Sequence, residues 1–314
     1  MIKTIAFISQ SSQESQNAWL EIIRAALPEE NIVHFENLTK AQREEVELAI
    51  VADPNPDDLK SLTSLKWVQS LWAGVEKMTG QLGDAPFKVV RLQDPEMSLK
   101  MAEAVVAWSL YLHRDMPLYA QQQKQKLWKE QVHARAGGRH IGLIGLGHLG
   151  LEAAKALSLL HFRVSGWSRS KKSIDGITCY AGESGLLDML SKVDIAVCLI
   201  PLTPQTRHLI NSERLNIMPC GAQIINFARG GIVDMDALLA ALDRGHIKHA
   251  VLDVFDVEPL PSTSPLWTHP SVTVLPHISG PTNLETATKI VAQNIRNYRK
   301  TGEIPESVDM VRGY

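Results

Sequence analysis

Three glycines between an apolar run and a helix-forming run constrain this chain most. The apolar run, residues 141–144, predicts a buried strand, and the sequence LEAAKALSLL, which follows GLGHLG at residues 145–150, predicts a helix. In this context the first glycine permits a tight turn, the second lets the main chain approach a pyrophosphate, and the third lets the helix pack on the strand. An incidental glycine-rich turn is the alternative. The motif predicts a dinucleotide site formed by Gly145, Gly147, His148, Leu149 and Gly150.

The rest of the sequence alternates short apolar runs with amphipathic stretches. Beyond residue 139 the expected strands are residues 141–144, 163–167, 195–200, 224–227, 250–254 and 272–275. Strands that alternate with helices predict an α/β fold with a doubly wound parallel sheet of the Rossmann type. In the first hundred residues the expected strands are residues 5–8, 46–51, 67–71 and 89–92, with a helix over 18–27. They predict a smaller, flavodoxin-like α/β unit.

Three segments connect these units. Ser98 is expected to cap a long apolar helix over residues 99–112, and the glutamine-rich residues 121–131 predict a linker or an arm. The tail, residues 283–300, predicts one amphipathic helix. No further strand is close enough to extend the second sheet, so we expect this helix to return to the first unit.

Length and charge exclude several classes of protein. With 314 residues, 45% of them hydrophobic, the chain is long enough for about two domains. The net charge of −2 and the scattered basic residues argue against a nucleic-acid partner. No segment has the length of a membrane span or the pattern of a signal peptide. Three widely spaced cysteines without a CxxC pair fit a reducing cytoplasm.

The end of the second Rossmann strand bears on the choice of cofactor. An NAD site usually has an acidic side chain there for the ribose hydroxyls, whereas this chain has Ser168, followed by Arg169, Ser170 and Lys171. Two cations without a carboxylate would accept a 2′-phosphate. The turn therefore favours NADP(H), with NAD(H) still possible. The alternative is that the two cations are solvated loop residues.

Three chemically distinct side chains follow three later strands. Arg229 follows the strand in NFARGG, Glu258 follows VLDVFDV, and His277 lies in LPHISG. A guanidinium can hold a carboxylate with two hydrogen bonds and stabilise a carbonyl oxygen, although a purely structural arginine is the alternative. A carboxylate on one imidazole nitrogen leaves the other nitrogen to donate a proton, although a lone histidine is more often structural. Together they predict reduction of a keto acid.

The other acids and histidines of this region have different expected roles. Asp253 lies at a strand end, where it is expected to contact the nicotinamide side of the cofactor, whereas Asp256 is interpreted as a loop residue. The histidines lack helix-face spacing, and the cysteine and histidine cluster of a zinc dehydrogenase is absent. No metal site is therefore expected.

These motifs resemble the D-isomer-specific 2-hydroxyacid dehydrogenase family over essentially the whole chain. The resemblance rests on GLGHLG, WSRS, PLTPQTRHLIN, NFARGGIVD, ALLAALDRGHIKHAVLDVFDVEPLP, SPLWTHPSVTVLPHIS and the terminal RGY. Within the family the chain is most similar to the glyoxylate/hydroxypyruvate reductase A group. The resemblance implies NADPH-dependent reduction of small 2-keto acids, glyoxylate to glycolate and hydroxypyruvate to D-glycerate.

The resemblance also implies roles for individual residues. Arg229 would bind and orient the keto acid, Glu258 would support the histidine, and His277 would be the general acid. The substrate would meet the main chain of Ala73, Gly74 and Val75, and the cofactor would meet Ile200, Pro201, Thr206 and Ala228. Trp72 and Trp267 are candidates for narrowing the substrate pocket, with core packing as the alternative.

The resemblance implies a discontinuous substrate domain, residues 1–97 and 283–314, around a cofactor domain, residues 98–282, with the active site in the cleft. Family members commonly form homodimers through the cofactor domain, for which helix 99–112 and the following arm are candidates. Two other functions stay open. One is a dehydrogenase of the same family for another keto acid, and the other is a dinucleotide-sensing interaction protein.

Overall fold

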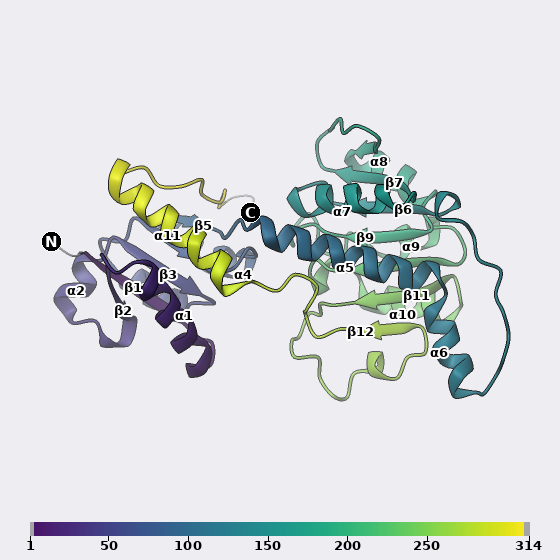
Figure 1. Ribbon diagram of the computed structural model, residues 1–314, viewed down its shortest axis with the longest axis horizontal. Helices are drawn as coiled ribbons and strands as arrows, with labels where there is room; N and C mark the ends of the chain where they lie inside the picture. The colour runs from purple at the N-terminus through teal and green to yellow at the C-terminus, as the bar shows by residue number, and fades with distance from the viewer. Residues whose placement is uncertain (1–2, 311–314) are drawn as a thin grey trace. The chain divides into compact units, whose positions relative to one another are not determined.

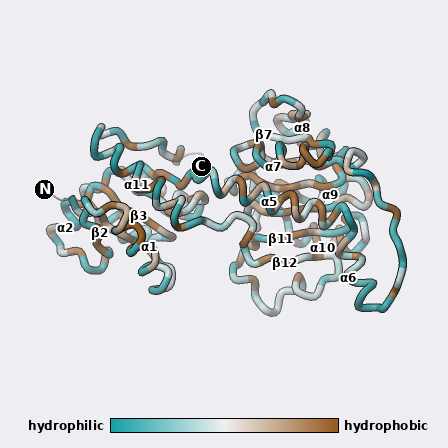
Figure 2. Tube along the Cα trace, in the orientation of Figure 1, coloured by the Kyte–Doolittle hydropathy of each residue, from teal (hydrophilic) through white to brown (hydrophobic). Residues whose placement is uncertain are grey.

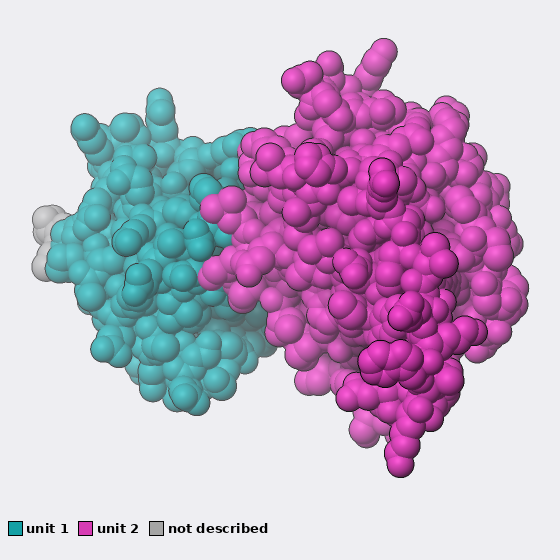
Figure 3. Space-filling view, turned by 45° about the vertical axis from the view of Figure 1, so that its right-hand side comes forward, with its two compact units in different colours: residues 1–96, 282–314 teal, residues 97–281 magenta. Residues whose placement is uncertain are grey.

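The computed structural model describes residues 3–310, so the terminal RGY of the resemblance lies outside the described residues. The chain divides into two compact units, which are coloured separately in Figure 3. Unit 1 comprises Met1–Glu96 and Thr282–Tyr314, and unit 2 comprises Met97–Pro281. Along its described part, the chain has no helix with the length and apolar character needed to cross a membrane.

Unit 2 is built on a parallel sheet of seven strands. They are β6 (His140–Ile144), β7 (Arg163–Ser168), β8 (Thr178–Ala181), β9 (Ile195–Cys198), β10 (Ala222–Asn226), β11 (Ile247–Leu252) and β12 (Val272–Val274). Their order in the sheet is β12-β11-β10-β9-β6-β7-β8 (Figure 1). The chain fills the sheet in one direction from β6 to β8 and in the other from β9 to β12, so the direction reverses between β6 and β9. This reversal is the point at which doubly wound sheets bind their ligands.

Helices cover both faces of this sheet. They are α5 (Pro95–His113), α6 (Met116–Lys124), α7 (His148–Leu159), α8 (Gly182–Leu190), α9 (Ser212–Ile217) and α10 (Met235–Asp243), with short 3₁₀ turns η2 (Ala136–Gly138), η3 (Gly230–Ile232) and η4 (Pro265–Trp267). In β9, Ile195 and Val197 pack with α5 and α7, whereas Ala196 and Cys198 pack with α8, α9 and α10. Because successive side chains of a strand point to opposite faces, a strand buried on both faces reads as one apolar run. Figure 2 shows brown, hydrophobic stretches in the middle of unit 2 and teal, hydrophilic stretches along its outer segments.

Unit 1 has a second parallel sheet with the order β2-β1-β3-β4-β5. Its strands are β1 (Thr4–Ser9), β2 (Asn31–His34), β3 (Leu48–Ala52), β4 (Trp67–Ser70) and β5 (Lys88–Val90). Its helices are α1 (Gln13–Ala26), α2 (Lys40–Glu45), α3 (Pro56–Lys60), α4 (Glu76–Leu82) and α11 (Leu284–Thr301), with a 3₁₀ turn η1 (Phe35–Asn37). The C-terminal helix α11 packs on this sheet, where Asn294 donates to Gln69 at 2.9 Å and the rings of Trp67 and Tyr298 lie 5.3 Å apart. The strand order is that of flavodoxin-like folds.

The predicted fold class is confirmed, and some predicted boundaries are wrong. The sequence analysis starts the long apolar helix after Ser98, but α5 begins at Pro95 because Asp94 Oδ1 accepts the N–H of Glu96 at 2.9 Å. Ser98 is buried inside the helix. Two of the four edge strands, β2 and β8, were not predicted, since they are only partly buried and lack a continuous apolar run. The glutamine-rich stretch is divided between the end of α6 and an exposed segment.

One buried histidine makes the stability of unit 2 depend on pH. His249 of β11 is 5% exposed, and its Nε2 lies 2.9 Å from Thr273 Oγ1. Burial lowers the pKa of His249 to about 4. The folded chain therefore keeps this imidazole neutral at a pH where the unfolded chain protonates it, and the unfolded chain binds more protons.

We predict that the free energy of unfolding falls by about 2 kcal/mol between about pH 7 and about pH 5 because of His249. The contribution is fully present above the unfolded pKa and is lost as the pH falls toward the folded value. Urea unfolding followed by circular dichroism at both pH values measures it. In His249→Gln, which keeps a donor for Thr273, this part of the pH dependence should disappear. His161→Asn, at an exposed turn, is the control, and an equal effect of both substitutions would contradict the assignment.

Candidate active site

The glycine-rich turn lies where the sheet of unit 2 reverses its direction. Gly145 has a φ of 117°, and a Cβ on it would lie 2.6 Å from the carbonyl oxygen of Leu199, at the end of β9. A Cβ on Gly150 would lie 1.9 Å from the carbonyl oxygen of Gly145, so α7 approaches the turn too closely for any side chain. At Gly147 a Cβ would meet no atom within 4 Å, so protein packing does not demand glycine there. Open space before a helix N-terminus fits a pyrophosphate.

The turn after β7 is folded back toward the glycine-rich turn. Ser168 Oγ donates to the carbonyl oxygen of Ser170 at 2.8 Å, which closes the turn, while Arg169, Ser170 and Lys171 are exposed. The ammonium of Lys172 donates to the carbonyl oxygen of Leu146 at 2.7 Å. The sequence analysis named Lys171 and missed Lys172, because the contact that distinguishes the two lysines is made with a residue of another turn. The structure thus places Lys172 on the glycine-rich turn, while Arg169 and Lys171 lie on the exposed turn after β7.

The segment after β9 closes the same region. Thr206 Oγ1 donates to the carbonyl oxygen of Pro201 at 2.7 Å and accepts the N–H of Thr203 at 2.7 Å. These bonds fix the loop that carries Ile200 and Pro201. A Cβ on Gly145 would lie 2.7 Å from Ile200 Cγ2, so the loop and the glycine-rich turn are in contact. The structure therefore brings together three of the segments that the sequence analysis assigned to the cofactor.

Strand register places Arg229, Asp253 and His277 at one edge of this sheet. Asn226 of β10 pairs with Leu252 of β11, which pairs with Val274 of β12. Arg229, Asp253 and His277 follow these positions within three residues, at the carboxyl ends of three adjacent parallel strands. Ligands of parallel α/β sheets bind at this edge.

Arg229 is held by the buried side chain of Asn226. The amide of Asn226 donates to the carbonyl oxygen of Arg229 at 2.9 Å and accepts the N–H of Ala228 at 3.1 Å, so it bridges the turn after β10. The guanidinium of Arg229 donates to the carbonyl oxygen of Ala228 at 2.7 Å. The main chain is thus fixed, and the half-buried arginine side chain starts from the carboxyl end of the strand.

His277 and Glu258 form a pair with both side chains accessible to solvent. Nδ1 of His277 lies 2.8 Å from Oε2 of Glu258, and these side chains are 52% and 35% exposed. The other carboxylate oxygen of Glu258 accepts the N–H of Phe255 at 2.8 Å. The carboxylate therefore holds one ring nitrogen of His277, and Nε2 is the nitrogen on the other side of the ring.

Asp253 has a part in this site that the sequence analysis missed. Its carboxylate, 2% exposed, accepts the N–H groups of Ile278 at 2.8 Å and Ser279 at 2.9 Å, and its carbonyl oxygen accepts the N–H of His277 at 3.0 Å. His277 has a φ of 55°, which is uncommon for a residue with a side chain. Asp253 thus holds the main chain on both sides of His277. Its contact with the nicotinamide side stays a prediction.

The predicted substrate residues lie on different elements of the fold. Trp72, Ala73, Gly74 and Val75 form the turn between β4 and α4, at the carboxyl edge of the sheet of unit 1. Trp267, by contrast, lines a hollow of about 340 Å³ with Tyr111, Gln121 and Thr273, beside the start of β12, whereas His277 follows the end of that strand. The role of Trp267 as a substrate residue stays a prediction. No group of three or more metal-ligating side chains occurs among residues 3–310.

Comparisons with known proteins give the relatives of this chain. Residues 106–279 match the family described as "D-isomer specific 2-hydroxyacid dehydrogenase, NAD binding domain". Over 302 residues the chain is 38% identical to glyoxylate/hydroxypyruvate reductase A of Yersinia enterocolitica, covering 94% of this chain and 96% of that protein.

Two solved structures are similar over nearly their whole length. A D-isomer specific 2-hydroxyacid dehydrogenase from Xanthobacter autotrophicus Py2, in complex with NADPH, has a TM-score of 0.92 and 37% identity, with 100% of both chains covered. An NADPH-dependent glyoxylate/hydroxypyruvate reductase from Sinorhizobium meliloti, in complex with NADP and sulfate, has a TM-score of 0.91 and 29% identity, with 99% of this chain and 100% of that one covered. This chain therefore belongs to the D-isomer-specific 2-hydroxyacid dehydrogenases, a family of NAD(P)-dependent oxidoreductases.

Proposed function

We propose that this protein reduces small 2-keto acids with NADPH in the cytoplasm, glyoxylate to glycolate and hydroxypyruvate to D-glycerate. The observation that carries the proposal is the hydrogen bond of 2.8 Å between His277 Nδ1 and Glu258 Oε2, at the ligand-binding edge of a parallel sheet. The relatives named as glyoxylate/hydroxypyruvate reductases support the substrate class. Three free thiols, Cys179, Cys198 and Cys220, support a reducing compartment.

In this proposal the protein binds both the carboxylate and the keto oxygen of the substrate. The main-chain N–H groups of residues 73–75 bind the carboxylate, and Arg229 pairs with the carboxylate and the keto oxygen. Bound NADPH supplies the hydride that adds to the keto carbon. As negative charge develops on the keto oxygen, Arg229 stabilises it and His277 Nε2 donates a proton to it, which completes the hydroxyl group. Glu258 accepts the Nδ1–H of His277, so the ring that donates from Nε2 is the imidazolium, which carries a proton on both nitrogens.

In this proposal the cofactor binds to unit 2. Gly147, His148 and Leu149, at the N-terminus of α7, would hold the pyrophosphate. Arg169, Ser170 and Lys171 bind the 2′-phosphate, and Lys172 fixes their turn to the glycine-rich turn through Leu146. Ile200, Pro201, Thr206, Ala228 and Asp253 line the nicotinamide side. The absence of a carboxylate at Ser168 favours NADPH over NADH.

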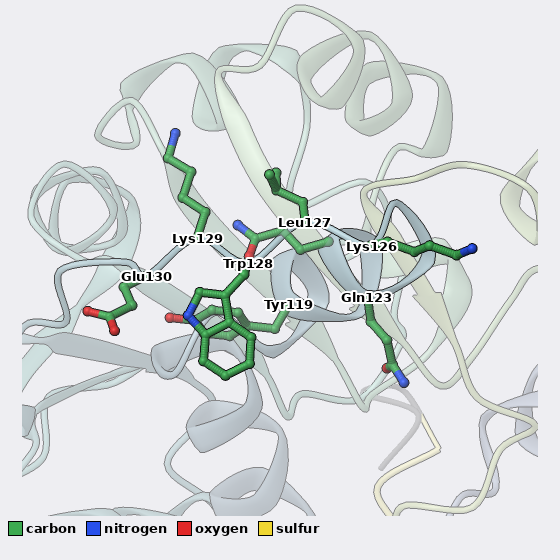
Figure 4. A pocket seen from close by; sticks show the side chains of 8 residues that line it. Tyr119, Gln123, Lys126, Leu127, Trp128, Lys129 and Glu130 are labelled. Carbon is green, nitrogen blue, oxygen red and sulfur yellow. The ribbon is translucent and has the colours of Figure 1, made fainter.

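We also propose a homodimer formed through unit 2. The segment after α6 exposes Trp128 (94%) and Val132 fully to solvent. Tyr119, Gln123 and Trp128 line a hollow of about 510 Å³ on this arm (Figure 4). Exposed apolar residues gathered on one segment are typical of protein–protein contacts, and aromatic side chains are enriched in such contacts.

Substitution of His277 tests its proposed role as the proton donor. His277→Ala should lower kcat for glyoxylate by on the order of 10²-fold to 10⁴-fold, because the keto oxygen loses its acid. NADPH absorbance follows turnover, and NADPH fluorescence checks that the cofactor still binds. The control is His269→Ala, because His269 pairs with Asp243 at 3.2 Å near the start of β12. No turnover by the unaltered protein with glyoxylate, hydroxypyruvate, pyruvate or phenylpyruvate would contradict the proposed function.

Substitution of Arg169 tests the proposed binding of the 2′-phosphate. Arg169→Ala should raise KM for NADPH about tenfold and leave KM for NADH nearly unchanged, since a charge-assisted hydrogen bond contributes roughly 1.5–3 kcal/mol. Initial rates at saturating glyoxylate measure both constants. Arg163→Ala, at the other end of β7, is the matched control. An equal loss for the two cofactors would refute the assignment of Arg169.

Substitution of Trp128 tests the proposed dimer contact of the segment after α6. Trp128→Asp should convert the protein from dimer to monomer, because a carboxylate would be buried in the contact without a partner. Size-exclusion chromatography with light scattering measures the mass. Leu159→Asp, at an equally apolar and 80% exposed site on α7, should leave the mass unchanged. A monomeric unaltered protein would disprove the dimer.

A further inference from the structure

The main chain of Trp72 is fixed beside the turn of residues 73–75. Ser70 Oγ accepts the N–H of Trp72 at 3.0 Å and lies 3.0 Å from its carbonyl oxygen, to which it donates. The same carbonyl oxygen accepts the N–H of Leu92, at 3.1 Å. With both main-chain polar groups bound, the position of the indole depends on what the ring packs against.

The indole of Trp72 packs against Trp19 of α1. The two ring centroids are 6.0 Å apart, and the rings are inclined by 81°, an edge-to-face arrangement that aromatic pairs favour. Trp19 is 3% exposed, whereas Trp72 is half-buried, so one ring is enclosed and the other keeps an open side.

Trp19 is itself held in place by the first turns of α1. Gln16, one turn earlier, donates to the carbonyl oxygens of Ser9 at 3.3 Å and Ser11 at 2.8 Å. Its own amide oxygen lies 2.5 Å from His34 Nε2. These contacts tie the start of α1 to the ends of β1 and β2, and Trp19 therefore offers Trp72 a fixed surface.

We propose that Trp72 limits the size of the substrate side chain, and that Trp19 is the positioning residue that holds Trp72 in place. The proposal rests on the proposed function, in which residues 73–75 bind the substrate carboxylate. In a 2-keto acid the group on the keto carbon is only two bonds from the carboxylate carbon, so it lies close to the residue beside the turn. A fixed indole leaves room there for the hydrogen atom of glyoxylate or the hydroxymethyl group of hydroxypyruvate, and obstructs the benzyl group of phenylpyruvate.

A purely structural role for Trp19 and Trp72 would change kcat/KM in a different way. If Trp19 and Trp72 only stabilised unit 1, loss of either ring would lower kcat/KM for every substrate by the same factor. If Trp19 positions Trp72, loss of Trp19 frees the indole, and the bulky substrate gains relative to the small one. The ratio of kcat/KM for phenylpyruvate to kcat/KM for glyoxylate distinguishes the two roles.

The test compares Trp19→Leu, Trp72→Ala and their double variant, with NADPH as the cofactor. Trp19→Leu should raise the ratio about tenfold, the scale on which enzymes discriminate substrates by size, and Trp72→Ala should raise it at least as much. The ratio measured for the double variant should be only slightly higher than the ratio for Trp72→Ala, because Trp19 acts through Trp72. Trp19→Phe, which keeps a ring at this position and disturbs folding less, should raise the ratio about threefold.

Trp67→Leu is the matched control, since Trp67 is fully buried in the same unit but packs on Tyr298 of α11. It should lower the melting temperature and leave the ratio unchanged. An unchanged ratio in both Trp19 variants, with turnover of glyoxylate retained, would overturn this inference alone. No turnover of any keto acid by the unaltered protein would instead overturn the proposed function.

Discussion

The candidate active site depends on the buried carboxylate of Asp253. It accepts two main-chain N–H groups from the segment after His277, at 2.8 Å and 2.9 Å. A carboxylate that is 2% exposed needs such partners, and each charge-assisted bond contributes roughly 1.5–3 kcal/mol. This is enough to hold His277 at a φ of 55°, which costs on the order of 1–3 kcal/mol. Glu258 then fixes the ring, so one carboxylate sets the main chain of His277 and another sets its side chain.

The position of His277 and Glu258 in the sheet distinguishes them from a second, chemically similar histidine–carboxylate pair. His269 and Asp243 also form a histidine–carboxylate pair, at 3.2 Å, but His269 lies before β12, whereas His277 lies after it. In a parallel sheet the carboxyl ends of neighbouring strands meet at one edge, so His277 is grouped with Arg229 and His269 is not. The chemistry of a side chain therefore indicates function only together with the strand end from which it starts.

Sequence predicts those parts of the protein that local constraints determine. The glycine-rich turn was predictable because close approach and a positive φ exclude other residues at Gly145 and Gly150. The central strands were predictable because burial on both faces gives long apolar runs. The outer strands β2 and β8, half-buried and partly polar, carry no such signal. Lys172 and the holding role of Asp253 depend on contacts with distant segments, which composition and spacing do not encode.

The residues proposed for the chemistry and those proposed for selectivity belong to different units of the chain. Arg229, Glu258 and His277 belong to unit 2, whose core forms without any residue of unit 1. Trp19 and Trp72 belong to unit 1, and their contact lies within that unit. Packing changes in one core have little effect on a separate core, because substitutions at distant sites with no shared partners contribute independently. If Trp72 limits the substrate side chain as proposed, the accepted substrate can change through α1 and the turn after β4 while the proposed proton donor and cofactor turn stay as they are.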